Sequence, residues 1–104
     1  MSDIVTLRDG SRVNKFEVVL TAMALQRLDE ATLRDAFLMS HLDLPLPAYG
    51  DGRERLRRER ILEPDGTMRE DTRVVIKHLL TSNDPLQPLT TRISPNLSAL
   101  CMPV

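Results

Sequence analysis

Aromatic residues are scarce in this sequence. Two phenylalanines and one tyrosine account for 3% of its 104 residues, and tryptophan is absent. The core must therefore consist of Leu, Val, Ile and Met, which bury less area per side chain than aromatic residues do. A chain of this length forms one domain with a modest core.

Disulfides, a strong net charge and long apolar runs are also absent. Cys101 is the single cysteine, which fits a reducing compartment. A formal net charge of −1 provides no overall field that would attract nucleic acid or an anionic membrane. No apolar run reaches the roughly 20 residues that span a bilayer, and residues 1–4 lack the features of a secretion signal. We therefore expect a cytoplasmic protein that binds no membrane.

The sequence contains no residue pattern typical of an active site, a cofactor site or a metal site. His41 and His78 have no Cys, His or Asp at a metal-ligand spacing. Cys101 lies between Leu100 and Met102, without a charge that would stabilise a thiolate. A phosphate-binding glycine motif and a nucleophile elbow are also missing. We therefore expect a non-enzymatic protein with no cofactor, no metal and no small-molecule substrate.

The first residues predict a β-hairpin. Residues 4–7 and 11–13 are strand-like and flank Asp9 and Gly10, a pair that favours tight turns. A ribbon of two strands is only marginally stable by itself. We therefore expect it to lie on the helices or to extend the sheet of a partner.

Two helices are expected next. Asn14 is a candidate N-cap for a helix over residues 15–28, with Glu17 at the capping-box position. Asp29 is the candidate cap of a second helix that extends to about residue 41. The tight link between the two predicts a helical hairpin.

The first of these helices is apolar nearly all round. One stripe consists of Phe16, Val19, Leu20 and Met23, and a second apolar stripe lies on the far side. A helix with this pattern is enclosed by other elements or by another subunit. Because so small a chain has few elements with which to enclose it, we expect this helix to bind a partner protein.

The second half of the chain predicts shorter elements. Prolines and glycines indicate a loop at residues 43–52, before a charged helix over residues 53–60. The sequence EPDG at residues 63–66 predicts a turn. Asp71 is the candidate cap of a last helix over residues 72–81.

The C-terminal stretch, residues 82–104, carries four of the seven prolines and shows no helical or strand period. Such a segment buries too little apolar surface to offset the entropy lost when it is ordered. We therefore expect an extended arm that lies on a partner and is distinct from a helical domain formed by residues 1–81.

The densest run of charge is RERLRRER at residues 53–60, with five arginines and two glutamates. Arginine suits phosphate, so a regulator that binds nucleic acid through this helix is one alternative. However, no aromatic side chain is interleaved for base stacking, and Glu54 and Glu59 would repel phosphate. We therefore expect the helix to face solvent or a partner protein.

Several short motifs follow one another in the second half of the chain: LEPDG at 62–66, DTRVVIKHLL at 71–80, DP at 84–85, PLT at 88–90 and PN at 95–96. In this order they resemble the later part of a U-box, a metal-free relative of the RING domain. The resemblance implies a loop, a helix and a closing helix that starts at the Pro-Asn step. It further implies a module that docks a ubiquitin-conjugating enzyme, with Ile61, Leu86 and Pro88 at the contact surface.

Together these patterns predict a mainly α fold with a short N-terminal β-hairpin, a helical hairpin, two shorter helices and an extended proline-rich C-terminal arm. We interpret the protein as an adaptor or structural subunit that assembles with other protein subunits or with copies of itself, as in a virion or another large complex. The U-box-like module and the nucleic-acid-binding regulator are the alternatives. The candidate partner-binding residues are Phe16, Val19, Leu20, Met23, Ile61, Leu86, Pro88, Leu97 and Leu100.

Overall fold

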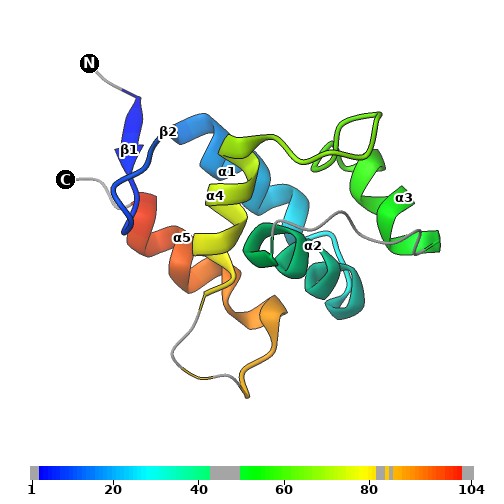
Figure 1. The fold of residues 1–104 in the computed structure, drawn as a ribbon. Helices are drawn as coiled ribbons and strands as arrows, with labels where there is room; N and C mark the ends of the chain where they lie inside the picture. The colour runs from blue at the N-terminus through cyan, green and yellow to red at the C-terminus, as the bar shows by residue number, and fades with distance from the viewer. Residues whose placement is uncertain (1–2, 43–49, 82–83, 85, 102–104) are drawn as a thin grey trace.

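The computed structural model describes residues 3–42, 50–81, 84 and 86–101 (Figure 1). Within these residues, a hairpin of two short strands precedes five α-helices and one 3-10 helix, so the predicted mainly α class is confirmed. The elements are β1 (Ile4–Thr6), β2 (Arg12–Asn14), α1 (Lys15–Leu25), α2 (Glu30–Leu42), α3 (Gly50–Arg58), α4 (Glu70–Leu79), η1 (Leu89–Thr91) and α5 (Ile93–Cys101).

The predicted hairpin is confirmed. β1 and β2 pair in antiparallel register with Val5 opposite Val13. Gly10 has a φ of +91°, a conformation that glycine adopts without steric cost. The carboxylate of Asp9 accepts a hydrogen bond of 2.9 Å from the main-chain N–H of Ser11. The buried side chain of Val13 anchors the ribbon to the helical core, as expected for a two-stranded ribbon.

The starts of α1 and α2 also follow the sequence. Asn14 caps α1, because its side-chain oxygen accepts a 2.8 Å hydrogen bond from the N–H of Phe16. Asp29 precedes α2, and its carboxylate accepts a hydrogen bond from the hydroxyl of Thr32. α1 ends at Leu25 rather than at residue 28, since the chain turns tightly there to bring Leu28 into the core.

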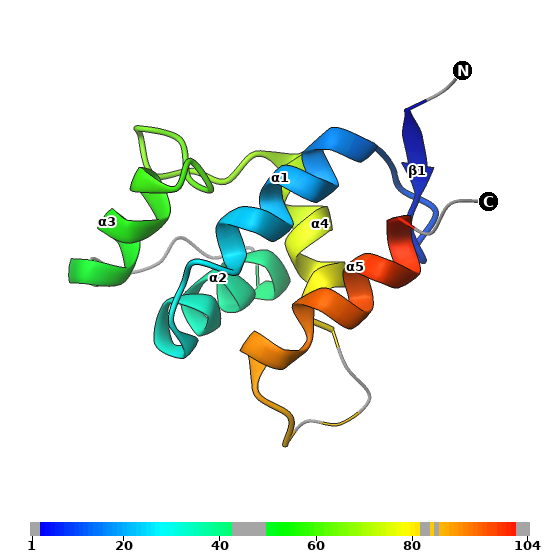
Figure 2. The same ribbon diagram turned by 180° about the vertical axis from the view of Figure 1, so that it is seen from behind.

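The core is aliphatic and lies where the helices meet. α4 packs against α1, α2 and α5, and α1 packs against α5 as well. Figure 2 shows α4 between α1 and α5. The largest fully buried apolar side chains are Leu25, Leu33, Leu56, Ile76, Leu79, Leu80 and Ile93. They come from all five α-helices and from the residue after α4, so one core joins these helices.

The prediction of an extended arm at residues 82–104 is wrong for residues 89–101. These residues form η1 and α5, and Leu89 and Ile93 are buried in the same core as the rest of the protein. The boundary expected after residue 81 therefore does not separate this segment from the core. Pro95 is compatible with α5 because it lies in the first turn, where its missing N–H has no partner to lose.

Polar side chains fasten this C-terminal segment to the other helices. Arg92 is only 9% exposed, and its guanidinium donates to the carbonyls of Leu80 (3.0 Å) and Gln87 (2.6 and 3.1 Å). The amide of Asn96 donates to the carbonyls of Leu79 (2.7 Å) and Thr81 (2.6 Å), at the end of α4. Tertiary hydrogen bonds thus order a segment whose sequence shows no helical or strand period.

Two further boundaries differ from the prediction. α3 begins at Gly50, although Gly50 and Gly52 were expected to exclude a helix. Glycine costs only about 1 kcal/mol in a helix, so neighbouring turns can overrule it; residues 43–49 of the expected loop lie outside the described residues. α4 begins after Arg69 rather than Asp71, because the N–H of Arg73 already bonds the Arg69 carbonyl at 2.9 Å.

The turn at residues 63–66 is confirmed. The N–H of Gly66 donates to the carbonyl of Glu63 at 2.8 Å, and Gly66 has a φ of +91°. Asp65 accepts hydrogen bonds from both the N–H (3.0 Å) and the hydroxyl (2.7 Å) of Thr67. The turn thereby fixes the direction in which the chain enters α4.

Glu30, at the start of α2, provides a test of how the C-terminal segment is held. Its carboxylate accepts hydrogen bonds from the N–H groups of Leu89 (2.8 Å) and Thr90 (3.1 Å). Partial burial opposes ionisation, but these N–H groups outweigh it and hold the pKa of Glu30 below its usual value. An acid with a lowered pKa in the folded state contributes stability above its unfolded-state pKa, and that contribution is lost as the pH falls through the folded-state pKa.

We predict that Glu30→Gln lowers the free energy of unfolding by about 1–2 kcal/mol at pH 7. The difference from the wild type should shrink below about pH 4, as measured by urea denaturation across the pH range. Glu54→Gln is the matched control, because its side chain is 62% exposed and should change stability little. An equal Glu30→Gln difference at pH 7 and pH 3 would contradict the prediction.

Candidate protein-interaction surface

One side of α1 is apolar and exposed to solvent. Phe16 is 63% exposed, Leu20 62% and Met23 46%. Their spacing of four and three residues places them on one side of the helix, which we call the apolar face of α1. The opposite side holds the fully buried Val18 and Leu25. The expectation that too few elements are present to enclose this helix therefore agrees with the exposure of its side chains.

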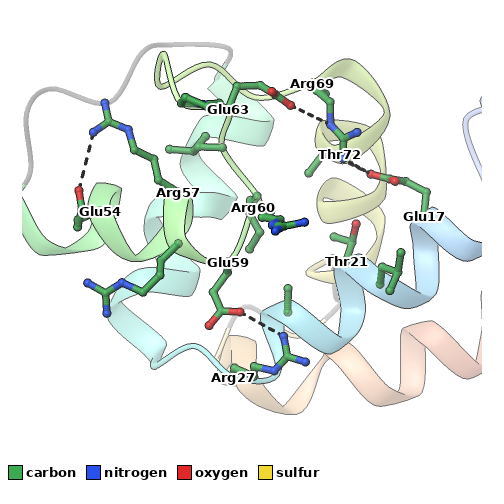
Figure 3. A pocket seen from close by; sticks show the side chains of 16 residues that line it. Glu17, Thr21, Arg27, Glu54, Arg57, Glu59, Arg60, Glu63, Arg69 and Thr72 are labelled. Atoms are coloured by element: carbon green, nitrogen blue, oxygen red, sulfur yellow. Dashed lines mark hydrogen bonds and ion pairs between the residues drawn. The ribbon is translucent and has the colours of Figure 1, made fainter.

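A groove of about 980 Å³ lies beside this face, between α1 on one side and the end of α3 with the chain that follows it on the other. Leu20 belongs both to the apolar face and to the groove wall, and Thr21 and Ala24 continue that wall along α1 (Figure 3). The buried residues Ile61 and Leu62 line the other side. We call this the α1–α3 groove.

Arginine–glutamate pairs build the two ends of the α1–α3 groove. At one end, Arg69 lies 2.9 Å from Glu17 and 3.3 Å from Glu63, and the hydroxyl of Thr72 donates to Glu17 at 3.0 Å. Glu17 therefore connects α1 to α4, although its position in the sequence suggested a capping box. These partly exposed pairs fix the shape of the groove more than they stabilise the fold.

At the other end of the groove, Arg27 lies 3.2 Å from Glu59 and connects the end of α1 to the residues after α3. Arg55 approaches the same carboxylate at 3.6 Å and donates to the main-chain carbonyl of Arg27 at 3.0 Å. Glu54 pairs with Arg57 at 3.8 Å. Much of the charge in the run at residues 53–60 is therefore neutralised by carboxylates of the same protein.

Arg60 occupies a backbone conformation that is normally left to glycine. Its φ is +62°, its N–H donates to the carbonyl of Arg57 at 3.0 Å, and the next N–H, of Ile61, donates to that of Leu56 at 2.9 Å. These two bonds form a Schellman motif that ends α3. A residue with a Cβ in this conformation costs about 1–2 kcal/mol relative to glycine.

The side chain of Arg60 is exposed and extends into the α1–α3 groove, between the two ends formed by the ion pairs (Figure 3). No described residue gives its guanidinium a hydrogen bond or an ion pair. Among the described residues, the groove therefore holds a cation without a partner next to an apolar wall. The sequence contains one indication of this arrangement, an arginine at a position after a helix where glycine is favoured. The helix was expected to extend to residue 60, so the sequence alone did not show that Arg60 follows its end.

A second groove, of about 750 Å³, lies between α2 and residues 86–92. Leu86 is 91% exposed there, and Pro88 is exposed beside it. The rings of Phe37 and His41 stack in it with centroids 4.0 Å apart, and burial lowers the pKa of His41. The two grooves share no lining residue, so they are separate surfaces.

The structure divides the nine predicted partner-binding residues into groups. Phe16, Leu20 and Met23 gather on the apolar face of α1, with Val19 half-buried at its edge. Leu86 and Pro88 belong to the second groove. Leu97 and Leu100 are half-buried and pack against the core, and Ile61 is buried in it, so these three side chains are less accessible than expected.

Within the part of the chain that the structure describes, no three His, Cys, Asp or Glu residues cluster as a metal site would require. No helix in that part combines the length and the apolar character needed to cross a bilayer. Comparisons with models of known protein families, with curated proteins and with solved structures find no match. The resemblance of residues 61–100 to a U-box therefore stays a prediction.

We predict that Arg60→Gly raises the free energy of unfolding by about 0.5–1 kcal/mol, because glycine relieves the left-handed conformation. Part of that gain is offset by the greater freedom of glycine in the unfolded chain. Arg60→Ala is the matched control, since it removes the same charge but retains a Cβ; it should bring no gain. Thermal and urea unfolding measure both variants, and equal effects of the two substitutions would contradict the prediction.

Proposed function

We propose that the protein is a non-enzymatic adaptor or assembly subunit that binds another protein through the apolar face of α1. The observation that carries this proposal is the exposure of Phe16, Leu20 and Met23 on one side of a helix whose other side is fully buried. Each large apolar side chain contributes about 1.5–3 kcal/mol when it moves fully out of water. A partner that covers all three would therefore gain several kcal/mol.

The second groove supports the adaptor aspect of this proposal. It presents Leu86, which is almost fully exposed, and it is formed by different elements from those beside the apolar face of α1. An adaptor needs two surfaces that two partners can occupy at once. The proposal no longer involves an extended C-terminal arm, because η1 and α5 pack on the core of the protein itself.

We predict that the double substitution Phe16→Gln with Leu20→Gln releases the partner bound by the apolar face of α1 and leaves the stability of the protein within about 0.5 kcal/mol of the wild type, because both side chains are exposed. The measurement is the native mass of the tagged, full-length protein taken from the cells that make it. Wild type should elute well above 11.8 kDa, and the double variant should elute at a lower mass than the wild type, because it lacks the partner bound by the apolar face of α1.

Leu86→Gln is the matched control, since it removes an equally exposed leucine from the other groove. It should leave the interaction made by α1 intact. A wild type that is monomeric in its own cells would overturn the proposed function, and so would a double variant whose complex has the same mass as that of the wild type. Two copies in the native species, with no other protein, would identify the partner as a second copy of this chain.

The U-box-like module is a second candidate, favoured by the order of the described elements. The turn at residues 63–66 is followed by α4, then by η1 at the Pro-Leu-Thr step, then by α5, which contains Pro95 and Asn96 in its first turn. This is the order that the resemblance implies. Of the three contact residues it implies, Leu86 and Pro88 are exposed and Ile61 is not.

If this candidate is right, the purified protein should accelerate discharge of ubiquitin from a conjugating enzyme, and Leu86→Ala should reduce the acceleration by about fivefold or more. Leu86 is preferred to Ile61 for this test, because truncating a buried isoleucine would also destabilise the fold. Met23→Ala, on the apolar face of α1 and outside this groove, is the control for a general loss of apolar surface. Absence of acceleration by the wild type across a panel of conjugating enzymes would rule the candidate out.

A further inference from the structure

We propose that the α1–α3 groove binds an acidic amphipathic segment of the partner protein, with a carboxylate paired to Arg60 and apolar side chains covering the apolar face of α1. The inference rests on the proposed function, because the apolar half of the contact is the surface described there. It adds the chemistry that selects the partner.

The charges of the residues that line the groove determine which sign of charge a complementary ligand must carry. All four glutamates that line it are already paired with arginines that line it: Glu17 and Glu63 with Arg69, Glu59 with Arg27, and Glu54 with Arg57. Arg58 and Arg60 also line the groove and have no carboxylate partner among the described residues. Because Glu17 and Glu63 share Arg69, five arginines face four glutamates in the lining, and the surplus is one positive charge. A complementary ligand therefore brings negative charge.

Backbone strain at Arg60 indicates that its side chain has a role other than ending α3. Ending α3 in the left-handed conformation requires only a residue that tolerates a positive φ, and glycine does so at the least cost. An arginine there is less favourable for the fold, and its charge is not used within the described chain. Strain of this kind is typically retained where a side chain has a role in binding.

The neighbours of Arg60 indicate an acidic peptide rather than a nucleic acid. A carboxylate that reaches Arg60 would lie in the same groove as Leu20 and Ala24, so its neighbours in the ligand must be apolar. A phosphate backbone carries a charge at every step and would also approach Glu54 and Glu63, which it would be repelled by. Single carboxylates between apolar side chains fit this surface.

The experiment uses the full-length protein and a displayed library of random peptides of 16 residues. We expect selection on the wild type to enrich peptides in which Asp or Glu lies next to Leu, Ile or Phe. The tightest peptide is then synthesised with a fluorescent label, together with a version in which its acidic residues are replaced by the amides, and binding is measured by fluorescence anisotropy. Arg60→Gly should weaken binding of the acidic peptide by about fivefold or more, although we expect this variant to be at least as stable as the wild type.

Arg60→Glu should weaken binding of the acidic peptide further. The amide version of the peptide should bind the wild type and Arg60→Gly with equal affinity. Arg12→Gly, on the exposed surface of β2 and outside the groove, is the control for a general change in net charge. Equal binding of the acidic peptide to wild type and Arg60→Gly would overturn the inference. So would tighter binding of a labelled single-stranded oligonucleotide that competes with the peptide.

The double variant Phe16→Gln with Leu20→Gln separates this inference from its premise. Peptides that lose binding to the double variant but not to the Arg60 variants would overturn the charge selection and leave the docking face in place. If the selected peptides bind the double variant as well as they bind the wild type, they do not use the apolar face of α1 and the inference is overturned, whereas the native-mass measurement decides separately whether the proposed function stands. Loss of binding in both sets of variants is the result that we expect.

Discussion

Hydrogen bonds from side chains to distant main-chain groups hold the second half of this fold together. The guanidinium of Arg92 is buried and donates to carbonyls at the end of α4 and in the loop that follows. A buried cation without such partners would be strongly unfavourable. The positions of α4, Gln87 and α5 therefore depend on one another through Arg92. Glu30 ties α2 to the same residues, because its carboxylate accepts hydrogen bonds from the start of η1.

The position of α5 decides which side of α1 stays exposed. α4 and α5 cover the side that carries Val18 and Leu25, and a chain of 104 residues has no further described helix to place over Phe16 and Leu20. Small domains bury a smaller share of their surface than large ones do. The apolar face of α1 therefore follows from the same packing that orders the C-terminal segment.

Local signals were sufficient for the hairpin, for the cap at Asn14 and for the turn at Gly66, because each depends on residues within a few positions of one another. The C-terminal helix could not be predicted in this way. The hydrogen bonds that hold it in place join Glu30 to residues 89 and 90, and Asn96 to the end of α4. Contacts between residues so far apart in the sequence leave no periodic pattern within the segment. The exposed stripe on α1 was predictable, whereas the groove beside it needed the end of α3 to be placed.

The fold does not explain why an arginine follows α3. The Schellman bonds at Arg60 involve only main-chain atoms, so glycine would satisfy them with less strain. Its guanidinium takes no part in the ion pairs of the groove, which join the four glutamates to Arg27, Arg57 and Arg69. A cation that neither the backbone nor its neighbours require, placed beside uncovered leucine, is best explained by a ligand with the complementary pattern of one carboxylate among apolar side chains.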